Sequence, residues 1–171
     1  MKQSISKALL RLMGWKTGPI IEDVPKCVIC AAPHTSNWDL IIGKLFYASI
    51  GRDARFLIKK EWFFFPFNLI FKSIGGIPVD RSKRTSITDQ VAEMFAHYDK
   101  LQVCITPEGT RKHVEEWKKG FYYIALKAGV PIVMAYIDMK TKNIGLLGVF
   151  HPTGDADKDI AEIRENYKRF E

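Results

Sequence analysis

The chain has 171 residues, 47% of them hydrophobic, and a formal net charge of +7 at pH 7. This length fits one compact domain with a sizeable core, and no apolar stretch approaches the ~20 residues that a membrane-spanning helix needs. The positive charge gathers in residues 1–20 and 52–84. It predicts an anionic partner, either a phosphate-bearing substrate, an acidic membrane surface or nucleic acid, unless the basic residues simply form solvated faces.

Three cysteines, Cys27, Cys30 and Cys104, lie in stretches with the pattern of strands. A Cys-x-x-Cys pair can bind metal, but the sequence has no second pair and no clustered histidines that would complete a zinc site. We therefore expect no metal, and three buried, reduced cysteines of the kind found in a reducing compartment.

Residues 1–20 form a basic, amphipathic segment. Arg11 interrupts an apolar stretch that is already too short for a signal peptide. We expect a helix here that either packs on the domain or lays its apolar face and Trp15 into a membrane surface, with the main domain in residues 21–171. The apolar residues at helical spacing are Ile5, Ala8, Leu9 and Leu12.

A histidine and an aspartate mark the corner between the first long strand and the next helix. The apolar, β-branched run 26–31 predicts a strand and residues 39–47 predict a helix, so His34 lies in the connection between them. A carboxylate that binds one imidazole nitrogen leaves the other free to accept a proton, which makes His34 a candidate general base oriented by Asp39. The alternative is an ordinary loop histidine beside an acid that the helix dipole favours.

The most aromatic stretch follows a strand expected at residues 54–58. Pro66 limits a continuous helix across residues 62–71, so we expect a turn or a helix start there. Aromatic density commonly means a packed core. Because lysines flank this stretch, an apolar groove with a basic rim is as good an interpretation as a packed core. Such a groove would suit an acyl chain or the membrane interface. The residues concerned are Trp62, Phe63, Phe64, Phe65 and Phe67.

Two further loops that follow predicted strands contain charged and polar side chains. Arg81 closes a turn and short strand at residues 75–81, and its planar guanidinium suits phosphate. The strand at 101–105 leads into a loop with a carboxylate, a permissive glycine, a hydroxyl and a guanidinium. Sites of α/β proteins are assembled at one edge of the sheet, so these loops are expected near His34; the alternative is a glycine turn with surface charges. The residues of the second loop are Glu108, Gly109, Thr110 and Arg111.

Helices and strands alternate along the chain. Helices are expected at about 86–98, 117–126 and 156–170, and strands at 130–136 and 144–150. The alternation predicts a single α/β domain with a mixed, mostly parallel β-sheet flanked by helices. The last strand is expected to be antiparallel, because only a short, polar connection precedes it.

Four segments in this order resemble the glycerophospholipid acyltransferase family, which includes the 1-acylglycerol-3-phosphate acyltransferases. The first is a histidine and an aspartate separated by four residues, matched by His34 and Asp39. The second is a Gly-x-Ile-x-x-x-Arg type segment that ends at Arg81, and the third is Pro-Glu-Gly-Thr-Arg at 107–111. The fourth is a Val-Pro-Ile-Val strand at 130–133, with a Lys-Gly-x-x-x-x-Ala segment before it.

The resemblance implies a role for each matched residue. His34 would be the general base and Asp39 its orienting partner, while Arg81 would hold the phosphate of the acceptor. The loop 108–111 would bind the acceptor around its glycerol and phosphate groups. The family takes acyl groups from acyl-CoA or acyl-carrier protein and needs no metal or other cofactor. Lys112 stands where the family commonly has serine, which leaves the selectivity for the head group open.

The expected function is that of an acyltransferase of phospholipid biosynthesis. It moves a fatty acyl group from acyl-CoA or acyl-carrier protein to a hydroxyl of a lysophospholipid or related glycerophosphate, on a glycerol-3-phosphate acyltransferase-like fold. By the resemblance we expect it in the cytoplasm, peripherally on the inner face of the cytoplasmic membrane. The alternative is a non-catalytic domain that binds lipid or acyl chains. Nucleic acid is not expected, because the chain has no helix-turn-helix or RNA-binding signature.

Overall fold

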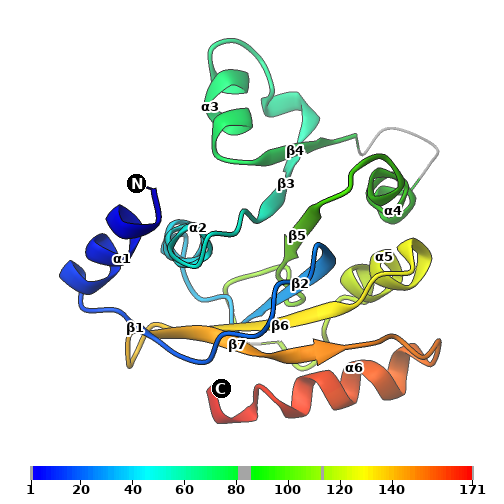
Figure 1. The fold of residues 1–171 in the computed structure, drawn as a ribbon. Helices are drawn as coiled ribbons and strands as arrows, with labels where there is room; N and C mark the ends of the chain where they lie inside the picture. Colours follow the sequence, from blue (N-terminus) through cyan, green and yellow to red (C-terminus); the bar gives the residue numbers. More distant parts are fainter. Residues whose placement is uncertain (1, 81–85, 113, 171) are drawn as a thin grey trace.

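A seven-stranded β-sheet in the order β1-β7-β6-β2-β5-β3-β4 organises the chain (Figure 1). The structure, a computed structural model, describes residues 2–80, 86–112 and 114–170. The strands are β1 (Lys16–Thr17), β2 (Lys26–Ala32), β3 (Arg55–Lys59), β4 (Gly76–Val79), β5 (Leu101–Ile105), β6 (Ile132–Asp138) and β7 (Asn143–Phe150). The α-helices are α1 (Lys2–Leu12), α2 (Trp38–Ser49), α3 (Phe67–Ser73), α4 (Ile87–His97), α5 (Gly120–Ala128) and α6 (Ala156–Glu165), and the 3-10 helices are η1 (Lys60–Trp62) and η2 (Lys168–Phe170).

The mixed, mostly parallel sheet and the antiparallel last strand are confirmed. Every pair of neighbouring strands is parallel except β6 with β7. In the turn between these two strands, Asp138 accepts hydrogen bonds from the backbone N–H groups of Lys140 (2.9 Å) and Thr141 (3.2 Å). So short a connection reverses the chain, because a parallel crossover needs a dozen residues or more. Strand β1 has two residues and leaves no pattern in the sequence.

Helices cover both faces of the sheet, and β2 shows how the sequence specifies this. Its side chains alternate between two apolar clusters. Val28 and Cys30 pack with residues of α4 and α5, while Cys27 and Ile29 pack with residues of α1 and α2. A strand that is buried on both faces is apolar throughout, as residues 27–32 are.

The N-terminal helix turns its apolar stripe outward. The buried side chains of α1 are Ser6 and Leu10, and Leu10 joins the cluster beneath α2. The residues that helical spacing singles out in the sequence are all exposed: Ile5, Ala8, Leu9 and Leu12. No helix among the described residues is long and apolar enough to cross a membrane.

The C-terminal helix is shorter than the sequence pattern predicts. Helix α6 ends at Glu165, and the 3-10 turn η2 follows. Tyr167 turns inward between them, and its hydroxyl donates a 2.7 Å hydrogen bond to the carbonyl of Cys30 in β2. This hydrogen bond holds the end of the chain against the sheet, where Phe170 stacks on Tyr136.

The cysteines are packed inside the fold. Cys27 and Cys30 are buried and Cys104 is partly buried. Burial raises the pKa of the Cys27 and Cys104 thiols to about 12, so both remain protonated at neutral pH. The described residues contain no group of three or more His, Cys, Asp or Glu side chains that could hold a metal ion.

A buried carboxylate ties α6 to the rest of the domain. Asp159 is 1% exposed and accepts hydrogen bonds from the Tyr122 hydroxyl (2.7 Å) and from the backbone N–H and hydroxyl of Thr153 (2.7 and 2.8 Å). Burial alone would raise the pKa of the Asp159 carboxyl, but the hydrogen bonds from Tyr122 and Thr153 outweigh it and hold the pKa below its usual value.

We expect Asp159→Ala to lower the free energy of unfolding by about 2–4 kcal/mol, because buried donors lose their acceptor. Urea unfolding measures this, with the exposed Asp99→Ala as a near-neutral control. The folded-state pKa lies below the unfolded-state value, so this contribution is present at neutral pH and is lost as the pH falls below about 4. Equal urea midpoints for Asp159→Ala and the wild type at pH 7 would contradict the assignment.

Candidate active site

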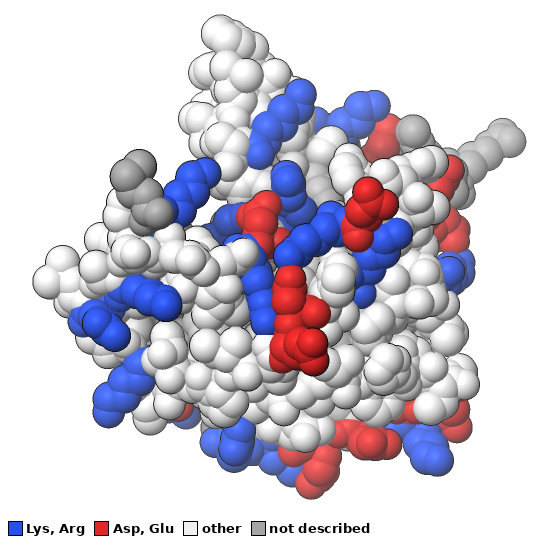
Figure 2. Space-filling view, viewed as in Figure 1, with Lys and Arg blue, Asp and Glu red and all other residues white. Residues whose placement is uncertain are grey.

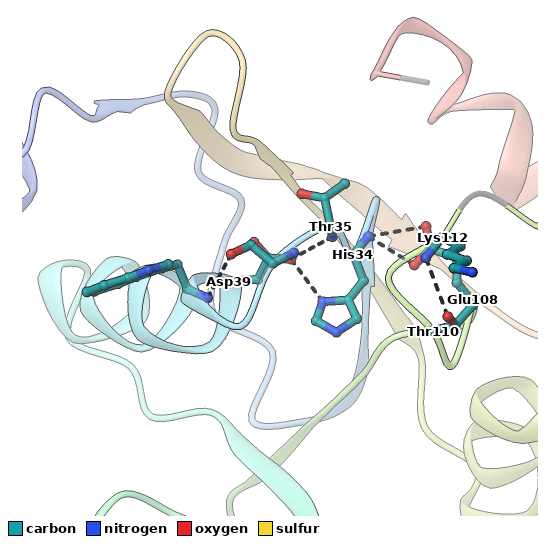
Figure 3. Close-up of polar contacts among 8 residues, drawn as sticks. His34, Thr35, Asp39, Glu108, Thr110 and Lys112 are labelled. Carbon is teal, nitrogen blue, oxygen red and sulfur yellow. Dashed lines mark hydrogen bonds and ion pairs between the residues drawn. The ribbon is translucent and has the colours of Figure 1, made fainter.

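His34 and Asp39 meet at the turn that joins β2 to α2 (Figure 3). Nδ1 of His34 lies 2.9 Å from Oδ2 of Asp39. A carboxylate can only accept, so Nδ1 carries the proton and Nε2 keeps the lone pair of a base. None of the described residues hydrogen bonds to Nε2. The His34 side chain is 23% exposed.

Asp39 orders the whole turn as well as the imidazole. The same oxygen, Oδ2, accepts hydrogen bonds from the backbone N–H groups of Thr35 (2.9 Å) and Ser36 (3.0 Å). The other oxygen, Oδ1, is buried and has no hydrogen-bond partner among the described residues. Because Asp39 is itself 6% exposed in the first turn of α2, the loop and the ring share one rigid support.

A second carboxylate holds the loop from the other side. Glu108 follows β5, and its two oxygens accept from the backbone N–H of His34 at 3.2 and 3.0 Å (Figure 3). Burial raises the pKa of the Glu108 carboxyl, although the hydrogen bond from His34 acts in the opposite direction. The family resemblance implies that Glu108 binds the acceptor; in the structure its carboxylate oxygens accept from the backbone N–H of His34.

The turn that carries Glu108 requires glycine. Gly109 has a φ of +62°, a conformation that side chains disfavour, and a Cβ there would lie 2.7 Å from the Lys118 amine. The Thr110 hydroxyl accepts a 3.4 Å hydrogen bond from the Lys112 backbone N–H, so it supports the loop. Arg111 is exposed beside it. Arg81, the remaining residue assigned from the sequence, lies outside the described residues.

An apolar cavity of about 360 Å³ includes His34 and Asp39 in its lining. Helix α2 supplies Leu40, Gly43 and Phe46, and Leu57 of β3 lies opposite. Two cations in the lining, Lys44 and Arg55, both form ion pairs with Asp53, at 2.5 and 3.1 Å. The aromatic residues 62–67 do not line it. Sequence reasoning missed the cavity because its walls come from ordinary apolar positions of separate elements, which carry no motif.

A smaller, basic cavity of about 200 Å³ lies on the Glu108 side of the His34 loop. Three cationic side chains line it, Arg111, Lys112 and Lys140, against two acidic ones, Glu108 and Asp138. Trp117 and Phe170 belong to the lining as well. The three cationic groups have no hydrogen-bond or ion-pair partner among the described residues, in contrast to Lys60, Lys100 and Lys119, which pair with acids. Lys140 belongs to the β6–β7 turn, and no feature of the sequence points to it.

The chain is similar to known acyltransferases. A model of the acyltransferase family matches residues 20–138. The 1-acyl-sn-glycerol-3-phosphate acyltransferases of Escherichia coli and Salmonella typhimurium are 28% and 26% identical over 125 residues, which are 69% of this chain and 49% of each relative. The chain thus spans about half the length of these curated relatives.

A solved structure shares the fold. The crystal structure of the 1-acyl-sn-glycerophosphate acyltransferase of Thermotoga maritima superposes with a TM-score of 0.67 and 18% sequence identity, over 98% of this chain and 75% of that one. The segment that matches the family model contains His34, Asp39 and the loop 108–111, and it makes up more than half of the chain. The chain therefore belongs to the acyltransferase family.

Proposed function

We propose that this protein transfers a fatty acyl group from the thioester of acyl-CoA or acyl-carrier protein to a hydroxyl of 1-acylglycerol-3-phosphate or a related lysophospholipid. The observation that carries the proposal is the His34–Asp39 pair in the wall of an apolar cavity, with no hydrogen bond from a described residue to Nε2. The activities that name the two curated relatives support the same reaction.

In the proposed mechanism His34 acts as the general base. Nε2 takes the proton of the acceptor hydroxyl as that oxygen attacks the thioester carbonyl, and Asp39 stabilises the imidazolium that forms. The tetrahedral intermediate collapses as the C–S bond breaks, and the imidazolium returns the proton to the departing thiolate. The products are an ester and a free thiol. The reaction written this way needs no metal, no other cofactor and no covalent acyl-enzyme.

The two cavities would provide separate binding sites for the acyl chain and for the phosphate of the acceptor. The apolar cavity would take the acyl chain, since its volume lies within the ~300–1,000 Å³ usual for ligand pockets and each CH₂ buried contributes about 0.8 kcal/mol. The cations Arg111, Lys112 and Lys140, which have no ion-pair partner among the described residues, would take the phosphate of the acceptor. The family resemblance implies a phosphate contact for Arg81 as well. Glu108 would then position His34 and leave contact with the acceptor to these cations.

The acceptor is a membrane lipid, so we place the reaction at a membrane surface. The exposed apolar stripe of α1 supports this, because Ile5, Leu9 and Leu12 face away from the domain beside the basic residues Lys7 and Arg11. The exposed stripe of α1 would contact the inner face of the cytoplasmic membrane. Trp15, which the sequence offers for the same contact, is 6% exposed and packs in the core, so it would take no part.

His34→Ala should reduce kcat by about 10²–10⁴-fold, because base assistance of this kind contributes that much. The assay follows formation of acylated product from purified lysophosphatidate and a labelled acyl-CoA. The exposed His97→Ala is the matched control and should retain activity. If His34→Ala kept most of the activity with an unchanged melting temperature, His34 would not be the base. A wild-type protein that binds lysolipid without forming product would favour a non-catalytic lipid-binding domain.

Glu108→Gln should lower kcat about 10–100-fold while the acceptor KM changes less than threefold. The glutamine amide keeps one oxygen that can accept a hydrogen bond, but it places an NH₂ group near the His34 backbone N–H. The loop that carries the His34 base is then held less firmly. Steady-state kinetics with varied lysophosphatidate measure the split. The opposite result, a raised KM with unchanged kcat, would make Glu108 a ligand of the acceptor instead of a positioning residue.

Arg111→Ala should raise the KM for lysophosphatidate about 10-fold or more, because a charge-assisted hydrogen bond to phosphate contributes about 1.5–3 kcal/mol. The KM for acyl-CoA should change little. Lys158→Ala removes an exposed cation of α6 outside both cavities and serves as the control. Equal acceptor KM values for Arg111→Ala and Lys158→Ala would remove Arg111 from the phosphate site.

A further inference from the structure

Residues 60–74, which comprise η1 and α3 and are called the aromatic projection below, are the least buried part of the described fold that is rich in large apolar side chains. Neither helix contains a buried residue. Phe65 is 78% exposed, Leu69 60% and Trp62 57%, and Phe64, Phe67 and Ile70 are each more than two-fifths exposed. Soluble proteins seldom leave so many large apolar side chains contiguous and open to water, except where they bind something.

The projection does not form the substrate cavity. None of residues 62–67 lines the apolar cavity beside His34. The rings contact one another instead, with centroids 5.2 Å apart for Phe64 and Phe67 and 5.7 Å apart for Phe63 and Phe71. The projection is therefore a self-packed cluster whose outer surface is apolar. Of the two uses that the sequence leaves open for these aromatics, an acyl groove and a membrane contact, this arrangement favours the second.

The charged residues around the projection indicate what kind of surface it binds. Glu61 is the single acid between residues 59 and 74. Lys59 and Lys72 are exposed and have no partner among the described residues, while Lys60 pairs with Asp80 at 3.2 Å. Figure 2 shows no charged side chain at the top of the projection, and Lys and Arg side chains gathered below it. Apolar and aromatic side chains ringed by cations match the acyl boundary and the anionic headgroups of a phospholipid surface.

The place of the projection in the fold agrees with this partner. The β2–β3 and β3–β4 connections step across the sheet in the same direction, so right-handed crossovers put α2 and α3 on one side of it (Figure 1). Helix α1, with its outward stripe, packs against α2 on that side. The apolar cavity is lined by α2 and by β3, the strand that leads into the projection. A lipid surface that touched α1 and the projection together would lie on the side of the sheet that carries the cavity.

We propose that the aromatic projection is a membrane-docking element that inserts its apolar side chains into an anionic phospholipid surface. Together with α1 it forms a two-point contact that orients the apolar cavity toward the lipid. This inference rests on the proposed function for its choice of partner. Its tests do not require turnover, so a failure of either proposal can be recognised separately.

Vesicle flotation with the full chain tests docking. Vesicles of phosphatidylglycerol and phosphatidylcholine should bind the wild type at least 10-fold more strongly than Phe65→Glu or Leu69→Glu. Tyr98→Glu, which places the same charge at an exposed aromatic after α4, should bind as the wild type does. His34→Ala should also bind normally, which separates docking from catalysis. Pure phosphatidylcholine vesicles should bind the wild type several-fold more weakly, because they offer no anionic headgroups to the basic residues.

Fluorescence locates the lipid contact. Vesicles with brominated acyl chains should quench tryptophan emission of the wild type, and Trp62→Phe should remove at least half of the quenchable signal. Equal binding by Phe65→Glu and the wild type would overturn the proposal. So would quenching that is lost with Trp38→Phe but kept with Trp62→Phe, which would place the lipid at α2. A dimer in solution that Phe65→Glu dissociates, without vesicle binding, would show that a second copy covers the projection.

Discussion

The hydrogen bonds that two carboxylates make to the His34 loop are the constraint on which the site depends. A loop at the end of a strand has backbone N–H groups without ladder partners, and buried N–H groups must be paired. Asp39 accepts those of Thr35 and Ser36, and Glu108 accepts that of His34. Because one carboxylate comes from α2 and the other from the end of β5, the loop is held between two rigid elements. The imidazole is therefore oriented before any substrate arrives.

This arrangement costs free energy. Asp39 keeps one buried oxygen without a partner among the described residues, and burial raises the pKa of the Glu108 carboxyl. Polar groups in such surroundings are destabilising by about 1–3 kcal/mol each unless they are well paired. The fold offsets the cost elsewhere, through a sheet whose central strand is buried on both faces and through ties such as Tyr167 to Cys30. An acid whose pKa is perturbed, as that of Glu108 is, is typical of a functional site when it lies in a cleft.

Apolar residues are used differently on the two sides of the sheet. On the side of α4, α5 and α6, apolar residues are buried in the core. On the side of α1 and α2, a core cluster coexists with an apolar cavity, an outward apolar stripe on α1 and the aromatic projection. Apolar surface that is kept out of the core stabilises nothing in water. Its concentration on one side of the sheet, the side that also carries the His34 cavity, agrees with the proposed reaction at a lipid surface.

The sequence by itself determined the α/β class, the order of the main helices and strands apart from the two-residue β1, the antiparallel last strand and the pairing of His34 with Asp39, because periodicity and short spacing are local signals. It did not determine the partner of Glu108, which a contact across 74 residues decides, nor the basic cavity, to which Lys140 and Phe170 come from separate parts of the chain. The direction of the α1 stripe was also undetermined. Helical spacing shows that Ile5, Leu9 and Leu12 share a face, but only packing against α2 decides whether that face turns inward or toward solvent.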